Sequence, residues 1–396
     1  MSAVRGLDEP SGHPEEELMA TQVYLDWNAT GKLRPEAHAA VTAALDITGN
    51  PSSVHGAGRA ARRLVETARE QVAALVGVAA RDVVFTSGGT EANMLALSPA
   101  LGDVLLVSAI EHPSVRSGGR FAAVEDIPVT AAGVVDLIAL ERLLAGRSRP
   151  LVSLMLANNE TGAIQPVAEA AALVHAAGGL LHVDAVQGPG RVACDFKVLG
   201  ADLMTLSSHK IGGPQGSGAL IKRDALALDP QIRGGGQERG ARAGTENVAG
   251  IAGFGAAAEA ARQGWAAEAT RMAALRDKLE SGIRAIALKA VVFSVEAARL
   301  PNTTLFSVPG MKAETAVIAF DLEGVAVSSG AACSSGKVAA SHVLAAMGVP
   351  AALTRGAIRV SLGYATSDDD VGMILKAWEK LSESLYKAGN QQEIAA

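Results

Sequence analysis

Three short segments combine residue types that could bind an anion, pair with a cation and supply a nucleophilic amine. The first is Ser87-Gly88-Gly89-Thr90-Glu91, which follows the apolar run 83–86 and opens a helical stretch. Backbone N–H groups freed by the glycines, the start of a helix and the Thr90 hydroxyl could together hold an anion. An ordinary glycine turn capped by Thr90 fits this motif equally well.

The second segment is His182-Val183-Asp184-Ala185-Val186-Gln187, at the end of the apolar run 180–183. A carboxylate at the carboxyl end of a buried strand faces the crevice where open α/β sheets bind ligands. Its natural partner is a cationic ring nitrogen, with an attraction of about 4 kcal/mol at ~4 Å and an effective dielectric of ~20, before desolvation is subtracted. The alternative role for Asp184 is to cap the following helix.

The third segment is Ser207-Ser208-His209-Lys210-Ile211-Gly212-Gly213, directly after the apolar run 203–206. A lysine between an apolar strand and glycines is partly desolvated, which lowers the pKa of its amine and favours a Schiff base. Ser207 and His209 add donors for a phosphate. Lys210 stands 26 residues after Asp184. Phosphate donors, a carboxylate and an amine are together what a pyridoxal 5'-phosphate site requires.

Short apolar runs rich in Val, Leu and Ile alternate with Ala-rich helical stretches through the first two thirds of the chain. The predicted strands are Val83–Thr86, Val104–Val107, Leu151–Leu156, Leu180–Val183, Leu203–Leu206 and Ala219–Ile221. The predicted helices between them include Ala60–Val76, Leu137–Leu143 and Val167–Ala176. Because the strands are continuously apolar, they favour a mainly parallel sheet that helices cover on both faces.

A long helical region, 248–287, interrupts this alternation. Strands near 304–308, 325–328 and 357–361 follow it, with helices near 314–321, 342–347 and 369–386. The pattern predicts a polar tail over 1–20, a large cofactor-binding domain over 21–265 and a smaller α/β domain over 266–396 that carries Cys333.

The amino-acid composition argues against a nucleic-acid-binding, disulfide-rich or membrane-spanning protein. The 396 residues carry a net charge of −6, and only 3% are aromatic, so nucleic acid is not the expected ligand. Two cysteines, Cys194 and Cys333, cannot form a disulfide framework, which predicts a reducing compartment. No signal peptide, membrane span or metal-ligand cluster is expected, and the predicted location is cytoplasmic.

At this point the sequence resembles the cysteine desulfurases, within class V of the fold-type I pyridoxal-phosphate enzymes. The resemblance runs from Tyr24 to about Tyr386. It is carried by YLDWNAT, NPSSVHGAGRAAR, FTSGGTEAN, EHPSV, NNETGAIQP, HVDAVQ, SSHKIGGPQGSG, GGGQERGARAGTEN, SSGAACSSG and IRVSLG, in family order. The number and order of these motifs carry the assignment, since no single one is decisive.

The resemblance implies a role for each residue around the cofactor ring. Lys210 would form the Schiff base, and after its displacement by substrate it would remove the α-proton. Asp184 would pair with the pyridine nitrogen, and Gln187 would hydrogen-bond the phenolic oxygen. His112 would stack on the ring and act as an acid or base.

Other residues would hold the phosphate and the substrate. The phosphate would be bound by residues of the first and third segments, namely Gly89, Thr90, Ser207 and His209. Thr245 would reach the phosphate from the neighbouring subunit, which implies a homodimer. Asn159 and Arg359 would bind the substrate carboxylate, a task that suits the two-pronged donor geometry of arginine. Without this context Asn159 would be a turn former and Arg359 a surface ion pair.

Cys333 decides which reaction the family resemblance implies. It lies in the Ser/Gly-rich stretch 328–336, which is predicted to be mobile and exposed, whereas Cys194 fits a buried apolar position. Its thiolate would attack the sulfur of L-cysteine, giving L-alanine and a Cys333 persulfide. An acceptor such as an iron–sulfur scaffold would then receive the sulfur.

Two other readings stay open. One is a different pyridoxal-phosphate enzyme, such as a selenocysteine lyase or a small-amino-acid transaminase. The other is a silent sulfur carrier or scaffold, against which the retention of Lys210, Asp184, His112 and Arg359 argues. The short polar end after Tyr386 favours the nitrogen-fixation-type branch of the desulfurases over the housekeeping one.

Overall fold

The computed structural model describes residues 22–330 and 341–394, with side chains up to residue 384. A seven-stranded sheet forms its larger part, in the order β2-β8-β7-β6-β5-β3-β4. The strands are β2 (Val83–Thr86), β3 (Val104–Ser108), β4 (Glu125–Ile127), β5 (Pro150–Met155), β6 (Leu180–Asp184), β7 (Leu203–Ser207) and β8 (Gly218–Lys222). The six predicted strands are confirmed; the short edge strand β4, with two acidic residues, had no apolar run to reveal it.

Strand β8 is antiparallel to both of its neighbours, while all other pairs that share a ladder in this sheet are parallel. Only residues 208–217 separate it from β7. A parallel crossover needs a dozen or more residues, so a connection this short returns the chain as an antiparallel neighbour. The mainly parallel sheet is therefore confirmed, with one reversed strand near its edge.

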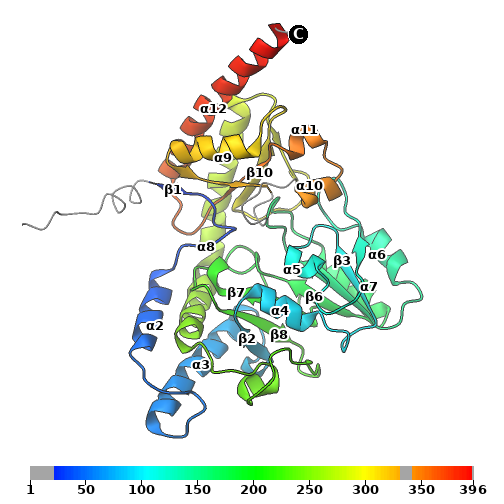
Figure 1. Cartoon of the computed structure of the whole chain (residues 1–396), viewed down its shortest axis with the longest axis vertical. Coiled ribbons are helices and arrows are strands. Elements are labelled where there is room, and N and C mark those ends of the chain that lie inside the picture. The colour runs from blue at the N-terminus through cyan, green and yellow to red at the C-terminus, as the bar shows by residue number, and fades with distance from the viewer. Residues whose placement is uncertain (1–21, 331–340, 395–396) are drawn as a thin grey trace, which may run out of the picture.

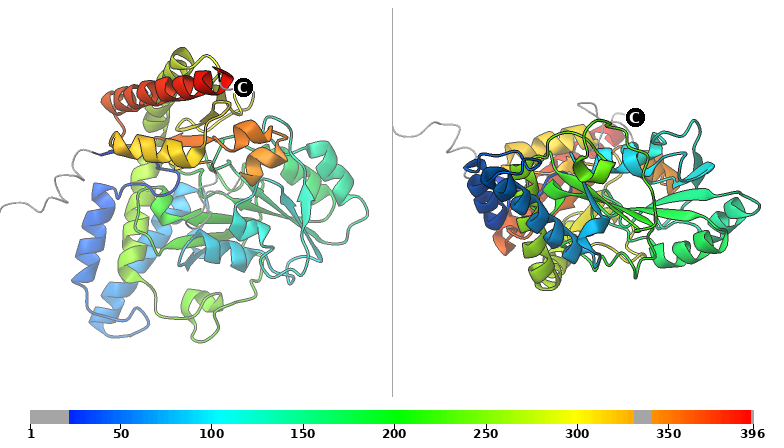
Figure 2. Two further views of the ribbon diagram at one scale, coloured as in Figure 1. Left: turned by 45° about the horizontal axis from the view of Figure 1, so that its top comes forward. Right: turned by 90° about the horizontal axis from the view of Figure 1, so that it is seen from below.

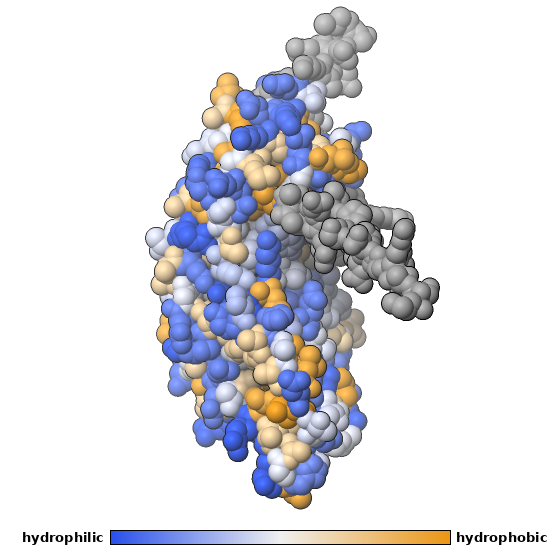
Figure 3. All heavy atoms as spheres, turned by 90° about the vertical axis from the view of Figure 1, so that its left-hand side faces the viewer, coloured by the Kyte–Doolittle hydropathy of each residue, from blue (hydrophilic) through white to orange (hydrophobic). Residues whose placement is uncertain are grey.

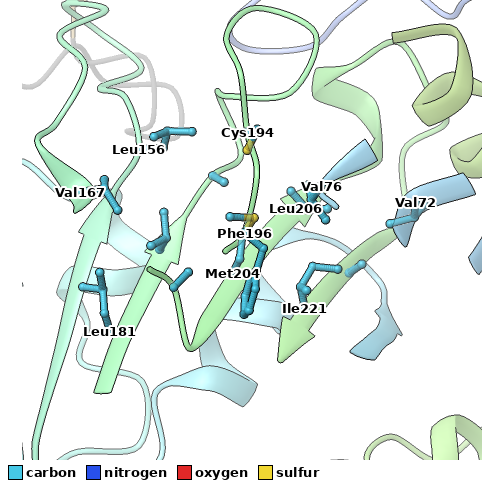
Figure 4. Packing of buried hydrophobic residues seen from close by; sticks show 14 of the residues in the cluster. Val72, Val76, Leu156, Val167, Leu181, Cys194, Phe196, Met204, Leu206 and Ile221 are labelled. Carbon is cyan, nitrogen blue, oxygen red and sulfur yellow. The ribbon is translucent and has the colours of Figure 1, made fainter. Parts of the chain in front are cut away.

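Helices cover both faces of this sheet, as Figures 1 and 2 show. One face packs against α3 (Gly56–Leu75), α6 (Leu137–Leu144), α7 (Val167–Ala176) and the first part of α8 (Val248–Ile286). The other face packs against α4 (Gly89–Ala96) and α5 (Pro113–Arg116). The side chains of β2 alternate between the two faces of the sheet, as the pleated backbone requires. Val83 and Phe85 pack into the hydrophobic cluster on the α3 face, and Val84 packs into the cluster on the α4 face. Figure 4 shows the first cluster around Met204 and Phe196. Helix α2 (Pro35–Leu45), which lies along α8, was not predicted.

A second, smaller sheet is antiparallel, with the order β12-β13-β10-β9. Its strands are β9 (Val291–Val292), β10 (Thr303–Ser307), β12 (Ser328–Ser329) and β13 (Ile358–Ser361). The helices around it are α9 (Ala313–Leu322), α10 (His342–Ala346), α11 (Ala351–Thr354) and α12 (Asp368–Ile394). Trp378 of α12 packs its ring against Phe306 and Phe320 in this second core.

The predicted strand over 325–328 is wrong as one element. It divides at Val327 into β11 (Val325–Ala326) and β12, which belong to different sheets. Strand β11 pairs in parallel with β1 (Val23–Tyr24), which was not predicted because it is only two residues long. This pairing brings the start of the described chain to the smaller sheet, close to β13.

Helix α8 passes without a break through residue 265, where the domain division was predicted. Residues Ile251–Ala261 of this helix contribute to the larger core, and Met272–Ile283 contribute to the second. Val23 and Leu25 also lie in the second core. The division of the chain at residue 265 stays a prediction.

The described helices differ from what a membrane span requires. None of the described helices combines the length and apolar character that a bilayer crossing requires. On the face drawn in Figure 3, hydrophobic residues are interspersed with hydrophilic ones.

A buried ion pair ties α3 to the loop before α8. Arg69 and Glu238 form a two-pronged pair at 2.7 and 2.8 Å, and Glu238 also accepts the N–H of Phe85 at 2.9 Å. Both side chains are nearly inaccessible, at 4% and 3% exposure. Glu238→Ala would leave the guanidinium buried without its partner, so we expect it to lower the free energy of unfolding by about 3–5 kcal/mol.

Urea unfolding of the apo-protein measures this loss. Glu66→Ala is the matched control, because Glu66 pairs with the same Arg69 but is half exposed, so its loss is expected to cost about 0–1 kcal/mol. Equal effects of the two variants would contradict the prediction.

Candidate active site

A cavity of about 300 Å³ opens where β5, β6 and β7 end. Most of the residues predicted from the sequence line it together: Gly89, Thr90, His112, Asn159, Asp184, Gln187, Ser207, His209, Lys210 and Arg359. Thr245 lines a separate cavity with Arg242 and Glu246. Cys333 lies outside the described residues.

Asp184 ends β6 and lies at the cavity with 6% exposure. Its Oδ1 accepts the N–H of Val186 at 3.0 Å, and its Oδ2 accepts from Asn93 Nδ2 at 2.9 Å. The same Nδ2 donates to Ser114 Oγ at 2.9 Å. Asp184 thus accepts the N–H of a residue after the strand, as a capping role would require. Its second oxygen is held by Asn93, which belongs to α4.

His112 is the N-cap of the short helix α5. Its Nδ1 accepts the N–H of Ser114 at 3.1 Å and lies 2.8 Å from Ser114 Oγ. Since Nδ1 accepts, the proton of the neutral ring is on Nε2. Burial lowers the pKa of His112, and Lys210 and His342 lower it further, against an opposing effect of Asp184. The ring is therefore neutral at pH 7 with a donor at Nε2.

Several residues that line the cavity carry groups able to bind an anion, and α4 begins at one of them, Gly89. A Cβ on Gly89 would lie 3.0 Å from Val186 Cγ2 and 3.6 Å from Ser207 Cβ, so a glycine lets the start of this helix approach β7 closely. Thr90 and Ser207, which carry hydroxyls, line the same cavity. His209 lies beside them with Nδ1 3.2 Å from Thr30 Oγ1, and burial lowers its pKa to about 4.

Lys210 and Gln187 direct their nitrogens to one oxygen inside the cavity. Lys210 Nζ donates to Asn28 O at 2.6 Å and to Ala29 O at 2.8 Å. Gln187 Nε2 donates to the same Asn28 O at 3.0 Å. An amine and an amide donor from different elements thus share one backbone acceptor at the wall of the cavity.

Arg359 extends from β13 toward the cavity and is only 1% exposed, so it is not a surface residue. Its Nη2 donates to Asp26 Oδ1 at 2.6 Å, and its Nη1 to Asn159 O at 3.2 Å. Its Nε is buried and has no hydrogen-bond partner among the described residues. The guanidinium thus keeps an unused donor.

The turn that carries Asn159 is held by its neighbour. Asn158 Oδ1 accepts the N–H groups of Glu160 and Thr161, both at 2.9 Å. Asn158 therefore has the turn-forming role that was the alternative for Asn159, and the side chain of Asn159 lines the cavity.

Glu160 is buried beside this turn and is expected to make stability depend on pH. Burial raises its pKa to about 7, against the opposing effects of the Ser341 hydroxyl, 2.5 Å away, and of Arg359. The folded protein therefore favours protonated Glu160, and stability is lost as pH rises from about 4.5 to about 7. Above this window the cost is on the order of 3 kcal/mol.

Glu160→Gln removes the titrating group, so the stability of this variant relative to wild type is expected to rise by that amount between pH 4.5 and pH 8. Urea unfolding at the two pH values gives both differences. Other buried carboxyls, such as Glu111, are common to the two proteins and cancel. A difference that is the same at both pH values would refute the prediction.

The residues around the cavity fit pyridoxal phosphate. Hydroxyl, imidazole and helix N–H donors suit its phosphate, Asp184 suits its cationic ring nitrogen, and the amine of Lys210 suits its carbonyl carbon. The structure adds residues that sequence reasoning missed, namely Asp26, Asn28, Asn93, Ser114 and Arg191. Asp26, Asn28, Asn93 and Ser114 lie inside the motifs YLDWNAT, FTSGGTEAN and EHPSV, which could have drawn attention to them, whereas Arg191 lies in none of the motifs. Asn93 also follows Thr90 by three positions and so lies one helical turn further on.

Comparisons with known proteins agree with this geometry. The sequence pattern described as "Aminotransferase class-V" matches residues 23–374. A cysteine desulfurase of Cereibacter sphaeroides is 43% identical over 92% of this chain and 96% of its own length. The cysteine desulfurase IscS of Dictyoglomus turgidum is 38% identical over 93% and 96% of the two chains. The solved structure of a NifS-like protein from Rickettsia africae superimposes with a TM-score of 0.85, at 37% identity, over 92% of this chain and 99% of that one.

Ten predicted site residues share one cavity, and the matches extend over nearly the whole length of each relative. The fold is that of the fold-type I pyridoxal-phosphate enzymes, as expected from the sequence motifs. The chain belongs to the aminotransferase class-V family and, within it, to the cysteine desulfurases.

Proposed function

We propose that this chain uses pyridoxal 5'-phosphate to remove sulfur from L-cysteine, releasing L-alanine and leaving the sulfur as a persulfide on Cys333. The observation that carries the proposal is the meeting of Lys210, Asp184, His112 and Arg359 in one cavity. A sulfur carrier or scaffold would need none of these four side chains. The relatives at 38–43% identity that bear the name cysteine desulfurase support the choice of substrate.

The bound cofactor supplies an electron sink that stabilises negative charge at the substrate's α-carbon. In this proposal Asp184 would hold the ring nitrogen and Gln187 the phenolic oxygen, while Lys210 would supply the amine for the carbonyl carbon. The phosphate is held by Gly89, Thr90, Ser207 and His209. All of these residues line the same cavity, which supports the proposal.

Arg359 and Asn159 bind the carboxylate of L-cysteine, and Arg359 does so with its unused Nε–H and a second N–H. This orients the substrate with its α-proton toward Lys210, whose amine removes it once free. His112 donates or accepts a proton at Nε2.

The thiolate of Cys333 then attacks the substrate sulfur. A sulfur–sulfur bond forms, the carbon–sulfur bond breaks with its electron pair remaining on carbon, and protonation of that carbon gives L-alanine.

Two partners complete the proposal. In a homodimer, Thr245 of one copy would reach the phosphate in the other; this is compatible with Thr245 lining a different cavity from Lys210 within its own chain. The persulfide would pass to an acceptor protein such as an iron–sulfur scaffold. We also propose a cytoplasmic location, since a reducing compartment keeps the Cys333 thiol available.

The decisive test is product analysis of the wild-type protein with pyridoxal phosphate, L-cysteine and a reductant. Sulfide and alanine in equal amounts are expected. A strong preference for selenocysteine over cysteine would indicate a selenocysteine lyase. A 2-oxo acid without sulfide would indicate a transaminase, and no turnover of either substrate would indicate a carrier; each of these results would overturn the proposal.

A further inference from the structure

A buried guanidinium lies directly behind the cavity. Arg191 follows the turn Gly188-Pro189-Gly190 and is 6% exposed. Its hydrogen bonds go to oxygens of neutral groups: the side-chain Oε1 of Gln187, the backbone O of Gln187 at 3.1 Å, Lys210 O at 3.3 Å and Trp27 O at 3.5 Å. Within the described residues it forms no salt bridge.

Keeping a cation buried without a carboxylate is unfavourable, and burial lowers the pKa of Arg191 to about 10, with a further contribution from the charge of Arg359. The side chain is still charged at neutral pH. We therefore ask which groups the buried Arg191 orients. Its hydrogen bonds go mainly to Gln187 and to the backbone of Lys210.

The contact with Gln187 determines the orientation of its amide. A guanidinium has only donors, so the amide atom that faces Arg191 must be the acceptor, Oε1. The donor Nε2 then points the other way, where it meets Asn28 O at the cavity at 3.0 Å. A carbonyl acceptor at Asn28 and a donor at Arg191 thus select the same orientation.

We propose that Arg191 is a positioning residue, which fixes the amide of Gln187 with its N–H toward the cavity. An acceptor oxygen of the bound cofactor would then face the Nε2 donor of Gln187 and not its carbonyl oxygen Oε1. Through Lys210 O and Trp27 O the same guanidinium ties together the backbone on either side of this position. The inference rests on the proposed function, because the acceptor belongs to pyridoxal phosphate.

The test uses three substitutions of Arg191 that differ in whether the new side chain can donate or accept a hydrogen bond. The measured quantity is the affinity of the apo-protein for pyridoxal phosphate. Arg191→Lys keeps a donor-only head, and we expect affinity within about threefold of wild type. Arg191→Gln offers both a donor and an acceptor, and Arg191→Met offers neither. Both are expected to weaken cofactor binding by roughly tenfold or more, because only the Asn28 carbonyl then remains to select the orientation of the Gln187 amide.

A second readout separates orientation of Gln187 from support of the fold. In a Gln187→Ala background, Arg191→Gln is expected to cause little further loss of affinity. Gln187→Ala and Arg191→Gln are also expected to shift the absorption maximum of the bound cofactor in the same direction. Arg34→Met is the control: Arg34 is also buried and donates to the backbone beside Lys210, at Ile211 O, but it pairs with Glu268 at 2.7 Å and has no hydrogen bond to Gln187 among the described residues. Its effect should add to that of Gln187→Ala.

Wild-type affinity and absorbance in Arg191→Gln would overturn the inference, as would an undiminished effect of that change in the Gln187→Ala background. If Arg191→Met does not fold, the Lys and Gln variants still give the comparison. Failure of the wild-type protein to bind pyridoxal phosphate would instead refute the proposed function, so the two failures are distinguishable.

Discussion

Lys210→Ala is expected to lower the rate of sulfide release by on the order of 10³-fold or more while the protein remains folded. Lys210 has two tasks in the proposed reaction, since its amine bonds to the cofactor and also moves the α-proton. The side chain lies in the cavity, and its Nζ donates to carbonyls of the 26–30 turn. Alanine removes the amine but leaves the phosphate donors and Asp184 in place, so the cofactor should still bind, without covalent attachment.

Borohydride reduction followed by mass spectrometry measures this attachment independently of turnover. The cofactor mass should stay on wild-type protein and be absent from Lys210→Ala. Lys222→Ala is the matched control, because Lys222 ends β8, its Nζ donates to the nearby Asp224 O at 3.0 Å, and it does not line the cavity. It should retain both attachment and activity. Retained attachment in Lys210→Ala would assign the bond to another amine and refute the role of Lys210.

The larger sheet could be predicted because each of its main strands is an unbroken apolar run. Strand β5 is buried at all six positions, and such runs occur where helices cover both faces. The direction of β8 does not follow from its own residues, which look like those of β7. The direction of β8 follows from the short connection between β7 and β8, whereas the prediction of strands used only the periodicity of apolar residues. The split at Val327 is likewise invisible, because four extended residues read the same whether they join one sheet or two.

The part of the candidate site that could be predicted consists of residues in motifs at the ends of strands. Asp184, Ser207 and Lys210 each follow an apolar run, so the chain itself indicates that they face one crevice. The missed contacts join positions far apart in sequence. Asp26 and Arg359 are 333 residues apart, and their contact depends on β13 lying beside the start of the chain.

Arg191 was missed for a different reason. An arginine after a glycine turn is normally exposed, and nothing in the local sequence shows that this one is buried or that its partners are neutral oxygens. Its role becomes visible only when the backbone of Lys210 and the side chain of Gln187 are seen around the same guanidinium. Orientation of one amide by another side chain is information that a one-dimensional pattern does not carry.

The two cysteines of the chain provide a matched pair for the final prediction. Cys194 is buried in the larger core (Figure 4), and burial raises the pKa of its thiol to about 12. At pH 8 it is therefore a neutral thiol, which is neither a nucleophile nor accessible. Cys333, which lies outside the described residues, is the other candidate in the sequence for the sulfur acceptor.

We expect Cys333→Ala to abolish persulfide formation and to lower sulfide release by on the order of 10²-fold or more, while Cys194→Ala retains both. Protein treated with L-cysteine without reductant, then alkylated and digested, should carry one added sulfur on the peptide that contains Cys333. Cofactor binding should be the same in both variants, because the proposed reaction gives neither cysteine a role in holding the cofactor. Sulfide release that survives Cys333→Ala at the wild-type rate would mean that sulfur leaves without passing through this thiol, and a lyase reaction would then replace the transfer mechanism.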